Sequence, residues 1–260
     1  MGDTLFHMWG PFRKNIIDSH TFYVEQAQQR LLSQFQNVEQ EADKYGAEWL
    51  ENTSHLFDPE RDDPGDFYQQ AYEESISFYE MLDNMRNRTR LSVVAGMFHE
   101  WEKQLRSWTL KEITNWQNGE EVKKAVWKAN FKDIIDLFEN LGWPITTKKY
   151  YASLNKCRLV VNAFKHGNGD ALEEIRRSYP ELLVGLESDN LAYIEYSDHT
   201  DLKIETTHID EFSTAITAFW KDVPEYIINK GEYENIPKWF EKAYKKDANN
   251  THSETRKAAS

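Results

Sequence analysis

Arg158, Asn162 and His166 recur at intervals of four residues, and their side chains are of the types that carry out chemistry on phosphates. On a helix, residues four apart are neighbours on one face, so the three form a single ridge. An arginine fork binds phosphate oxygens, and a histidine exchanges protons near neutral pH. With Lys156 and Lys165 as further phosphate-binding residues, the pattern predicts an anion site in which His166 is the acid or base. The alternative is a solvated polar face whose histidine is favoured by the negative end of the helix dipole.

A second polar group contains His99 and Glu102, with Arg106 four residues after the glutamate. It lies on a predicted helix over 91–108, where Glu102 borders the apolar stripe. We interpret His99 and Glu102 as residues that support the first site. The alternative is a structural ion pair between Glu102 and Arg106, because buried charges need partners for stability alone.

Charge is distributed unevenly along the chain. The 260 residues carry 31 Lys and Arg against 44 Asp and Glu, a net charge of -13. Residues 143–169 hold five Lys and Arg and no acid, which leaves -18 for the rest. This balance excludes a generally basic nucleic-acid or anionic-membrane binder, but it leaves room for one confined anion site.

Apolar residues at steps of three and four predict a mainly α protein, a bundle of about five long helices. The low content of 11 Gly and 7 Pro favours the same class. The ridge lies on a helix over about 147–167, with Cys157 on its inward stripe and a left-handed residue at Gly167. Other helical stripes cover 19–55, 67–85, 91–108, 118–141, 171–178 and 212–223.

We expect one domain over 1–230, which includes a small β-hairpin at about 192–206 where the period changes to two. A polar extension, 231–260, follows and is predicted to be largely disordered after 247. A single cysteine excludes internal disulfides and cysteine-rich zinc sites. No nucleotide-binding loop or hydrolase elbow is present, and we expect no metal or cofactor. No apolar run reaches membrane-spanning length, which predicts a cytoplasmic protein without a membrane partner.

The string RLVVNAFKHG, residues 158–167, resembles the signature helix of the HEPN superfamily. Its members are α-helical bundles found among prokaryotic toxins and antiviral defence proteins, and many are metal-independent endoribonucleases that act as homodimers. The family motif is arginine, often followed by asparagine, then histidine after four to six intervening residues. Asn162 and His166 match it. Val161 occupies the arginine position, and Arg158 is displaced, with seven residues between it and His166.

The resemblance covers this helix and, in general architecture, roughly residues 65–230. It implies a HEPN-like protein of a bacterial defence or toxin system, with RNA as substrate and a cognate antitoxin or defence-system partner. In that interpretation Arg158 replaces the motif arginine one turn earlier, and Asn162 orients His166. The alternative is a noncatalytic α-helical scaffold or partner-binding protein built on the same helix.

Overall fold

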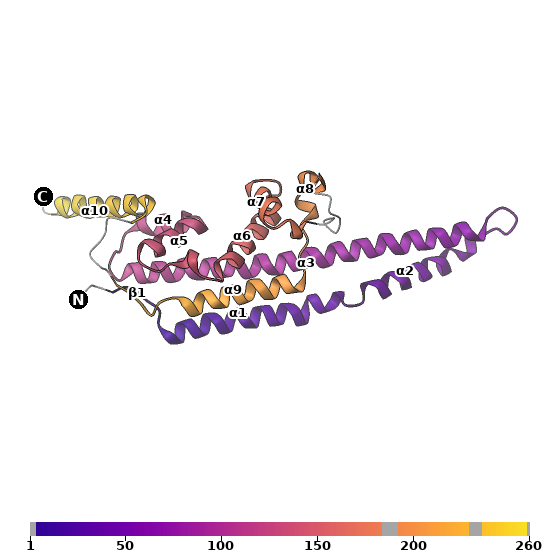
Figure 1. Ribbon diagram of the computed structural model, residues 1–260, viewed down its shortest axis with the longest axis horizontal. Helices are drawn as coiled ribbons and strands as arrows, with labels where there is room; N and C mark the ends of the chain where they lie inside the picture. The colour runs from indigo at the N-terminus through magenta and orange to yellow at the C-terminus, as the bar shows by residue number, and fades with distance from the viewer. Residues whose placement is uncertain (1–3, 184–191, 229–235, 259–260) are drawn as a thin grey trace.

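The protein is described here by a computed structural model over residues 4–183, 192–228 and 236–258, and its longest helices run along its length (Figure 1). The predicted mainly α class is confirmed. None of the described helices is apolar over enough residues to cross a membrane. In chain order the elements are β1 (Thr4–His7), α1 (Gly10–Arg30), η1 (Leu32–Phe35), α2 (Val38–Thr53), η2 (Ser54–Leu56), α3 (Pro64–Thr114), α4 (Glu120–Lys128), α5 (Phe131–Asn140), η3 (Ile145–Thr147), α6 (Tyr151–His166), α7 (Asp170–Ser178), η4 (Pro180–Leu182), α8 (Ala192–Tyr196), η5 (His199–Asp201), α9 (Thr206–Asp222), β2 (Tyr226–Ile228) and α10 (Lys238–Ala258).

The described residues contain nine α-helices of nine residues or more, besides the five-residue α8, so the prediction of about five long helices is wrong. Two predicted helices are interrupted. The stripe over 19–55 is broken by the 3-10 turn η1 between α1 and α2. The stripe over 118–141 is broken before α5, where Asn130 and Asp133 form a capping box that starts a new helix.

Helix α3 is continuous through residues 84–89, where the polar sequence indicated a break between two helices. No Gly or Pro occurs there to end it. The polar side chains instead hold a segment that crosses α3. Asn87 Nδ2 donates to the carbonyl of Leu202 at 2.8 Å, and Asn87 Oδ1 accepts from the backbone N–H of Ile204 at 3.1 Å. Arg90 donates to the carbonyl of Ile204 at 3.1 Å.

These contacts explain why the β-hairpin predicted at about 192–206 does not form. Residues 192–206 instead hold α8, η5 and an extended stretch that leads into α9. Asn87 gives this stretch the donor and the acceptor that a partner strand would supply, and Leu183 adds one isolated bridge to Leu202. The prediction failed because the partner is a helix side chain, which the local period cannot reveal.

The small sheet lies elsewhere, between β1 and β2. The two strands are antiparallel, and Phe6 is paired with Ile227. Met8 extends the contact through a backbone hydrogen bond of 2.9 Å to the carbonyl of Glu225. The sheet therefore joins the N-terminal segment to the chain just after α9.

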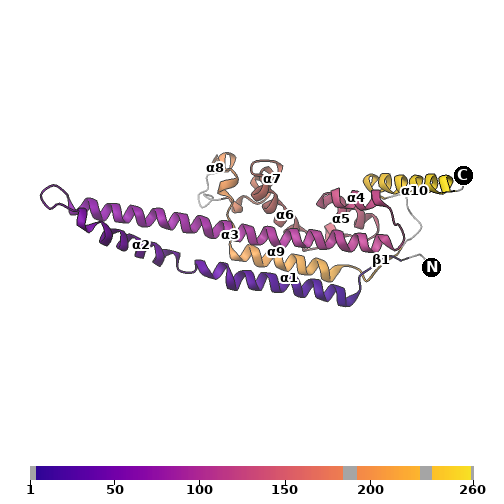
Figure 2. The ribbon, with the colours of Figure 1, turned by 180° about the vertical axis from the view of Figure 1, so that it is seen from behind.

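Helices α1, α3, α6 and α9 pack against one another to form the body of the protein (Figures 1 and 2). The core between them is strongly aromatic, and its largest buried side chains include Trp101, Trp108, Trp143, Trp220, Phe98, Phe138, Phe212 and Phe219. Cys157 lies on the inward face of α6 and is fully buried, as its stripe predicted. Burial raises the pKa of the Cys157 thiol well above its ordinary value, which keeps the thiol protonated.

Residues 38–85, which comprise α2, η2 and the N-terminal part of α3, project from the body as a two-helix arm (Figures 1 and 2). Small residues line the contact between its helices. A Cβ atom on Gly46 would lie 2.9 Å from both the carbonyl oxygen of Ala71 and the Cβ of Ser75. Ser75 Oγ donates to the carbonyl of Ala42 at 2.9 Å. The glycine therefore permits a close approach that any larger residue would prevent.

The arm carries most of the protein's net charge. Residues 38–85 hold fourteen Asp and Glu against two Lys and Arg, a net charge of -12, which leaves -1 for the other 212 residues. Most of the -18 that lies outside residues 143–169 is therefore on this arm. The body is therefore close to neutral, and the charge that repels polyanions at long range lies on the arm.

Helix α10, Lys238–Ala258, lies in the C-terminal extension. The disorder expected after residue 247 stays a prediction. Asp247 shows why the helix lies against the body. Its carboxylate accepts hydrogen bonds of 3.0 Å from the backbone N–H of Glu121 and 2.9 Å from that of Val122. Asp247 thus satisfies the free N–H groups that begin α4, a role that polar composition alone does not indicate.

Candidate functional site

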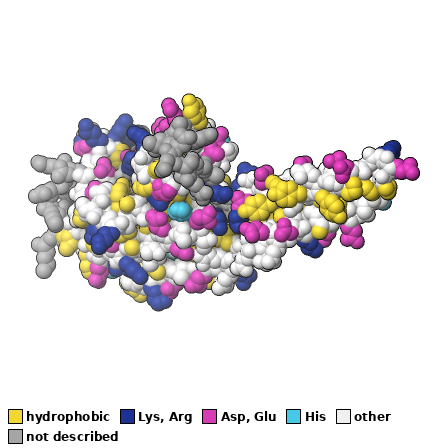
Figure 3. Space-filling model, turned by 45° about the vertical axis from the view of Figure 1, so that its right-hand side comes forward, with side chains coloured by type: hydrophobic (Ala, Val, Ile, Leu, Met, Phe, Trp, Pro, Cys, Tyr) yellow, Lys and Arg dark blue, Asp and Glu magenta, His cyan; other side chains and the backbone are white. Residues whose placement is uncertain are grey.

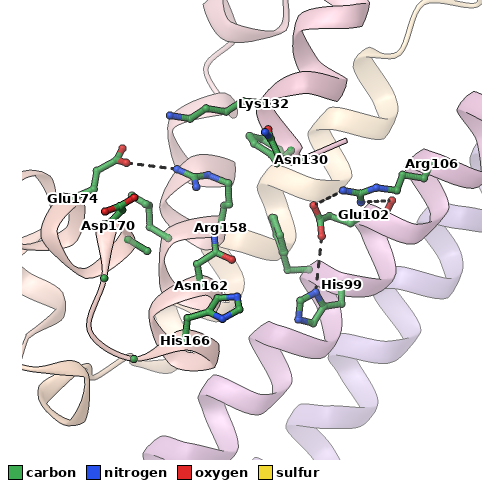
Figure 4. Close-up of a pocket in the computed structure, with 16 residues that line it drawn as sticks. His99, Glu102, Arg106, Asn130, Lys132, Arg158, Asn162, His166, Asp170 and Glu174 are labelled. Carbon is green, nitrogen blue, oxygen red and sulfur yellow. Dashed lines mark hydrogen bonds and ion pairs between the residues drawn. The ribbon is translucent and has the colours of Figure 1, made fainter. Parts of the chain in front are cut away.

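A cavity of about 550 Å³ contains the three α6 side chains that the sequence analysis identified (Figure 4). Arg158, Asn162 and His166 line it one helical turn apart, so the predicted ridge is a wall of this cavity. Helix α6 ends directly after His166, because Gly167 adopts φ 71°. That positive φ confirms the predicted left-handed residue and is a conformation that favours glycine.

The facing wall belongs to α3 and contributes His99, Glu102 and Arg106 (Figure 4). Glu102 lies between the other two: its Oε1 is 3.3 Å from Arg106 Nη2, and its Oε2 is 3.9 Å from His99 Nδ1. Arg106 Nη2 also donates to the carbonyl of Ala129 at 2.9 Å. The structure thus contains both the predicted ion pair and the predicted proximity of His99 and Glu102 to the α6 ridge.

Arg158 is held on several sides. Its Nε donates to Asn155 Oδ1 at 3.0 Å, and its Nη2 lies 3.6 Å from Glu174 Oε2. The guanidinium also lies over the Phe131 ring, 5.9 Å from its centroid. Nη2 is buried and makes no hydrogen bond within the described residues. Arg158 is therefore positioned toward the cavity but carries an acidic partner that an incoming phosphate would have to replace.

Asn162 and His166 lie on the same wall, toward the C-terminal end of α6 (Figure 4). The Asn162 side chain is half-buried and that of His166 is exposed. Among the described residues, neither has a hydrogen-bond or ion-pair partner. Both side chains are therefore free to contact a ligand, whereas a histidine that served only to cap backbone carbonyls would be occupied.

The structure separates the two predicted phosphate-binding lysines from this wall. Lys156 lies on the other side of α6, where its ammonium is 3.2 Å from Glu181 and 3.5 Å from Glu211 and lies over the Tyr179 ring. Lys165 is exposed beside the cavity and does not line it. The reason is helical rotation, since positions one and two residues away from the ridge point to other faces.

The cavity is electrically balanced. Its charged lining residues are three bases, Arg106, Lys132 and Arg158, and three acids, Glu102, Asp170 and Glu174. The positive charge of residues 143–169 is also offset elsewhere, because Lys148 pairs with Asp222 at 2.9 Å. Acids from α7 and α9 thus lie against the basic segment in space, so its positive charge is less concentrated than its sequence predicts.

The third wall, Asn130 to Lys132, and the acids of α7 were not predicted from the sequence. A signal for the wall was present in the capping pair Asn130 and Asp133, which marks the start of a helix. A continuous apolar stripe over 118–141 concealed it. Helix starts are often exposed to ligands, and this one brings Lys132 to the rim of the cavity (Figure 4).

Within residues 4–183, 192–228 and 236–258, no three His, Cys, Asp or Glu side chains are grouped as a metal ion would require. The lining of the cavity provides histidine, amide, carboxylate and guanidinium groups. Comparisons of the chain with protein-family models, with curated proteins and with solved structures give no match.

Proposed function

We propose that this protein is a HEPN-like, metal-independent endoribonuclease of a bacterial defence or toxin system. One observation carries the proposal: the cavity joins Arg158, Asn162 and His166 of α6 to His99 and Glu102 of α3, although the two groups are about 60 residues apart in the chain. Two histidines can serve as the base and the acid for cleavage of an RNA phosphodiester, and an arginine and an amide can stabilise and orient the reacting groups.

In this mechanism His166 accepts the proton of the ribose 2′-OH, and the 2′ oxygen attacks the adjacent phosphorus. The bond from phosphorus to the 5′ oxygen breaks, and His99 gives that oxygen a proton. The products are a 2′,3′-cyclic phosphate and a 5′-OH, with no net gain or loss of protons. Arg158 stabilises the negative charge on the phosphoryl oxygens, and Asn162 orients His166.

The near-neutral body makes an RNA substrate compatible with the acidic composition, because the repelling charge lies on the arm. We further propose that the enzyme is a cytoplasmic homodimer, in which two α6 ridges face one groove, and that a cognate antitoxin or defence-system partner controls it. A second function, a noncatalytic partner-binding protein, is favoured by Glu102 and Glu174, which form ion pairs with Arg106 and Arg158 without a ligand.

The test is cleavage of a single-stranded RNA by the purified full chain in EDTA. His166→Ala should lower the rate at least about 100-fold, as expected for loss of a general base. Lys149→Ala is the control, because this exposed lysine lies outside the cavity, and it should stay within a few-fold of wild type. Equal cleavage rates for wild type and His166→Ala, or no cleavage by wild type, would exclude the proposed nuclease activity. The partner-binding function would then remain.

A further inference from the structure

The arm has an unusual distribution of large and small side chains. Its contact between α2 and α3 includes small residues, Ala42, Gly46 and Ala71, all buried, and the stacked rings of Tyr45 and Phe78. Other large side chains lie outside this contact, and Tyr68 and Tyr72 are 65% and 62% exposed. A helix pair that needed only to fold would bury the large groups, because burial of apolar area is what stabilises it.

The exposed groups form a continuous stripe. Tyr68, Tyr72 and Ile76 follow one another at intervals of four, which advances about 40° round a helix at each step. Glu73 and Glu80, both exposed, lie three residues before and four after Ile76 and border the stripe. Figure 3 shows hydrophobic side chains gathered along the arm with acidic ones around them. An exposed apolar stripe with a charged border is typical of an interface.

We propose that this tyrosine stripe, Tyr68, Tyr72 and Ile76, is the docking surface for a basic, amphipathic segment of another protein. The net charge of -12 on residues 38–85 attracts a Lys- or Arg-rich partner and repels RNA and anionic membranes. It also disfavours a second copy, whose arm has the same charge and whose other residues carry only -1. Tyrosine supplies large, rigid contact area, so the stripe would anchor the apolar side of that segment.

The test measures binding of two synthetic peptides to the full chain by fluorescence anisotropy. One is a Leu/Lys amphipathic helix, and the other is a Ser/Lys peptide with the same number of lysines. The Leu/Lys peptide should bind at least about tenfold more tightly, and Tyr68→Ser/Tyr72→Ser should remove that advantage. Met81→Ser/Met85→Ser is the matched control, since both methionines are 59% exposed but lie about 160° round the helix from the stripe.

The control double variant should bind the Leu/Lys peptide within about threefold of wild type, because both substituted methionines lie outside the stripe. Equal binding of both peptides would overturn the proposal, since charge alone would then explain it. So would unchanged binding by the tyrosine variant, or self-association of wild type that this variant abolishes, which would make a second copy the occupant. Ile76→Ser gives a single change in the same stripe if the double variant does not fold. RNA cleavage is measured separately, so failure here leaves the nuclease proposal standing.

Discussion

Arg158 of α6 and Glu174 of α7 form an ion pair, 3.6 Å between Nη2 and Oε2, in the wall of the cavity. The arginine side chain is 14% exposed and the glutamate 33%, so water screens this pair only in part. A phosphate that enters the cavity competes with Glu174 for the same guanidinium. The acid therefore weakens anion binding by the residue best suited to it.

Glu174→Gln should strengthen binding of RNA because it removes the competing charge and keeps the side-chain volume. We expect the Kd of a non-cleavable 2′-O-methyl RNA, measured by anisotropy, to fall about three- to tenfold, the effect of one partly exposed ion pair. Glu173→Gln is the control, because Glu173 pairs with Arg176 outside the cavity. An unchanged or higher Kd for Glu174→Gln would show that Arg158 does not meet the RNA phosphate.

Gly46→Leu should separate the helices of the arm, since even a Cβ atom there would be 2.9 Å from the Ala71 carbonyl. We expect a local loss of about 1–3 kcal/mol, the range for overpacking. Hydrogen exchange should accelerate over residues 38–85 and stay unchanged in the body. Ala47→Leu, at an exposed position of the same helix, is the control. If hydrogen exchange in the arm is equally slow in Gly46→Leu and Ala47→Leu, the close contact at Gly46 is not required for the stability of the arm.

Asp222 should make stability depend on pH in the acid range. Burial alone would raise the pKa of its carboxyl, but hydrogen bonds from Trp143, Lys148 and Tyr150, each 2.9 Å, outweigh burial and lower the pKa below its usual value. A lowered folded-state pKa stabilises the protein above the unfolded-state value of about 3.9. That contribution is lost as the pH falls through the folded-state pKa.

Asp222→Asn should therefore lower the free energy of unfolding at pH 7 by about 1–3 kcal/mol, the cost of weakening charged hydrogen bonds. The difference in free energy of unfolding between Asp222→Asn and wild type should become smaller as the pH falls below about 4. Urea unfolding at pH 7, 5, 4 and 3 measures it. Asp18→Asn, at an exposed carboxylate 58% accessible to water, is the control and should differ little from wild type. A gap that stays constant with pH would contradict the assignment.

Local periodicity was enough to predict what lies on one helix. The face shared by Arg158, Asn162 and His166 and the inward position of Cys157 follow from rotation along α6, which neighbouring residues determine. The stop at Gly167 follows in the same way, because a positive φ favours glycine.

Relationships that depend on distant partners were not predictable. In the sequence, the polar run around Asn87 resembles a helix break. Its amide in fact binds the backbone of Leu202 and Ile204, which are distant in the chain. Asp247 resembles part of a solvated tail until the start of α4 lies against it. Glu174 is separated from Arg158 by the end of α6 and a tight loop, so only the three-dimensional structure shows that the charges in the cavity are balanced.

Helix α3 runs for 51 residues without a break and carries both the tyrosine stripe and the wall that holds His99 and Glu102. At 1.5 Å per residue, Ile76 and His99 are about 35 Å apart on one rod. The tyrosine stripe and this cavity wall are therefore joined by one continuous helical backbone, with no intervening loop that could act as a hinge between them.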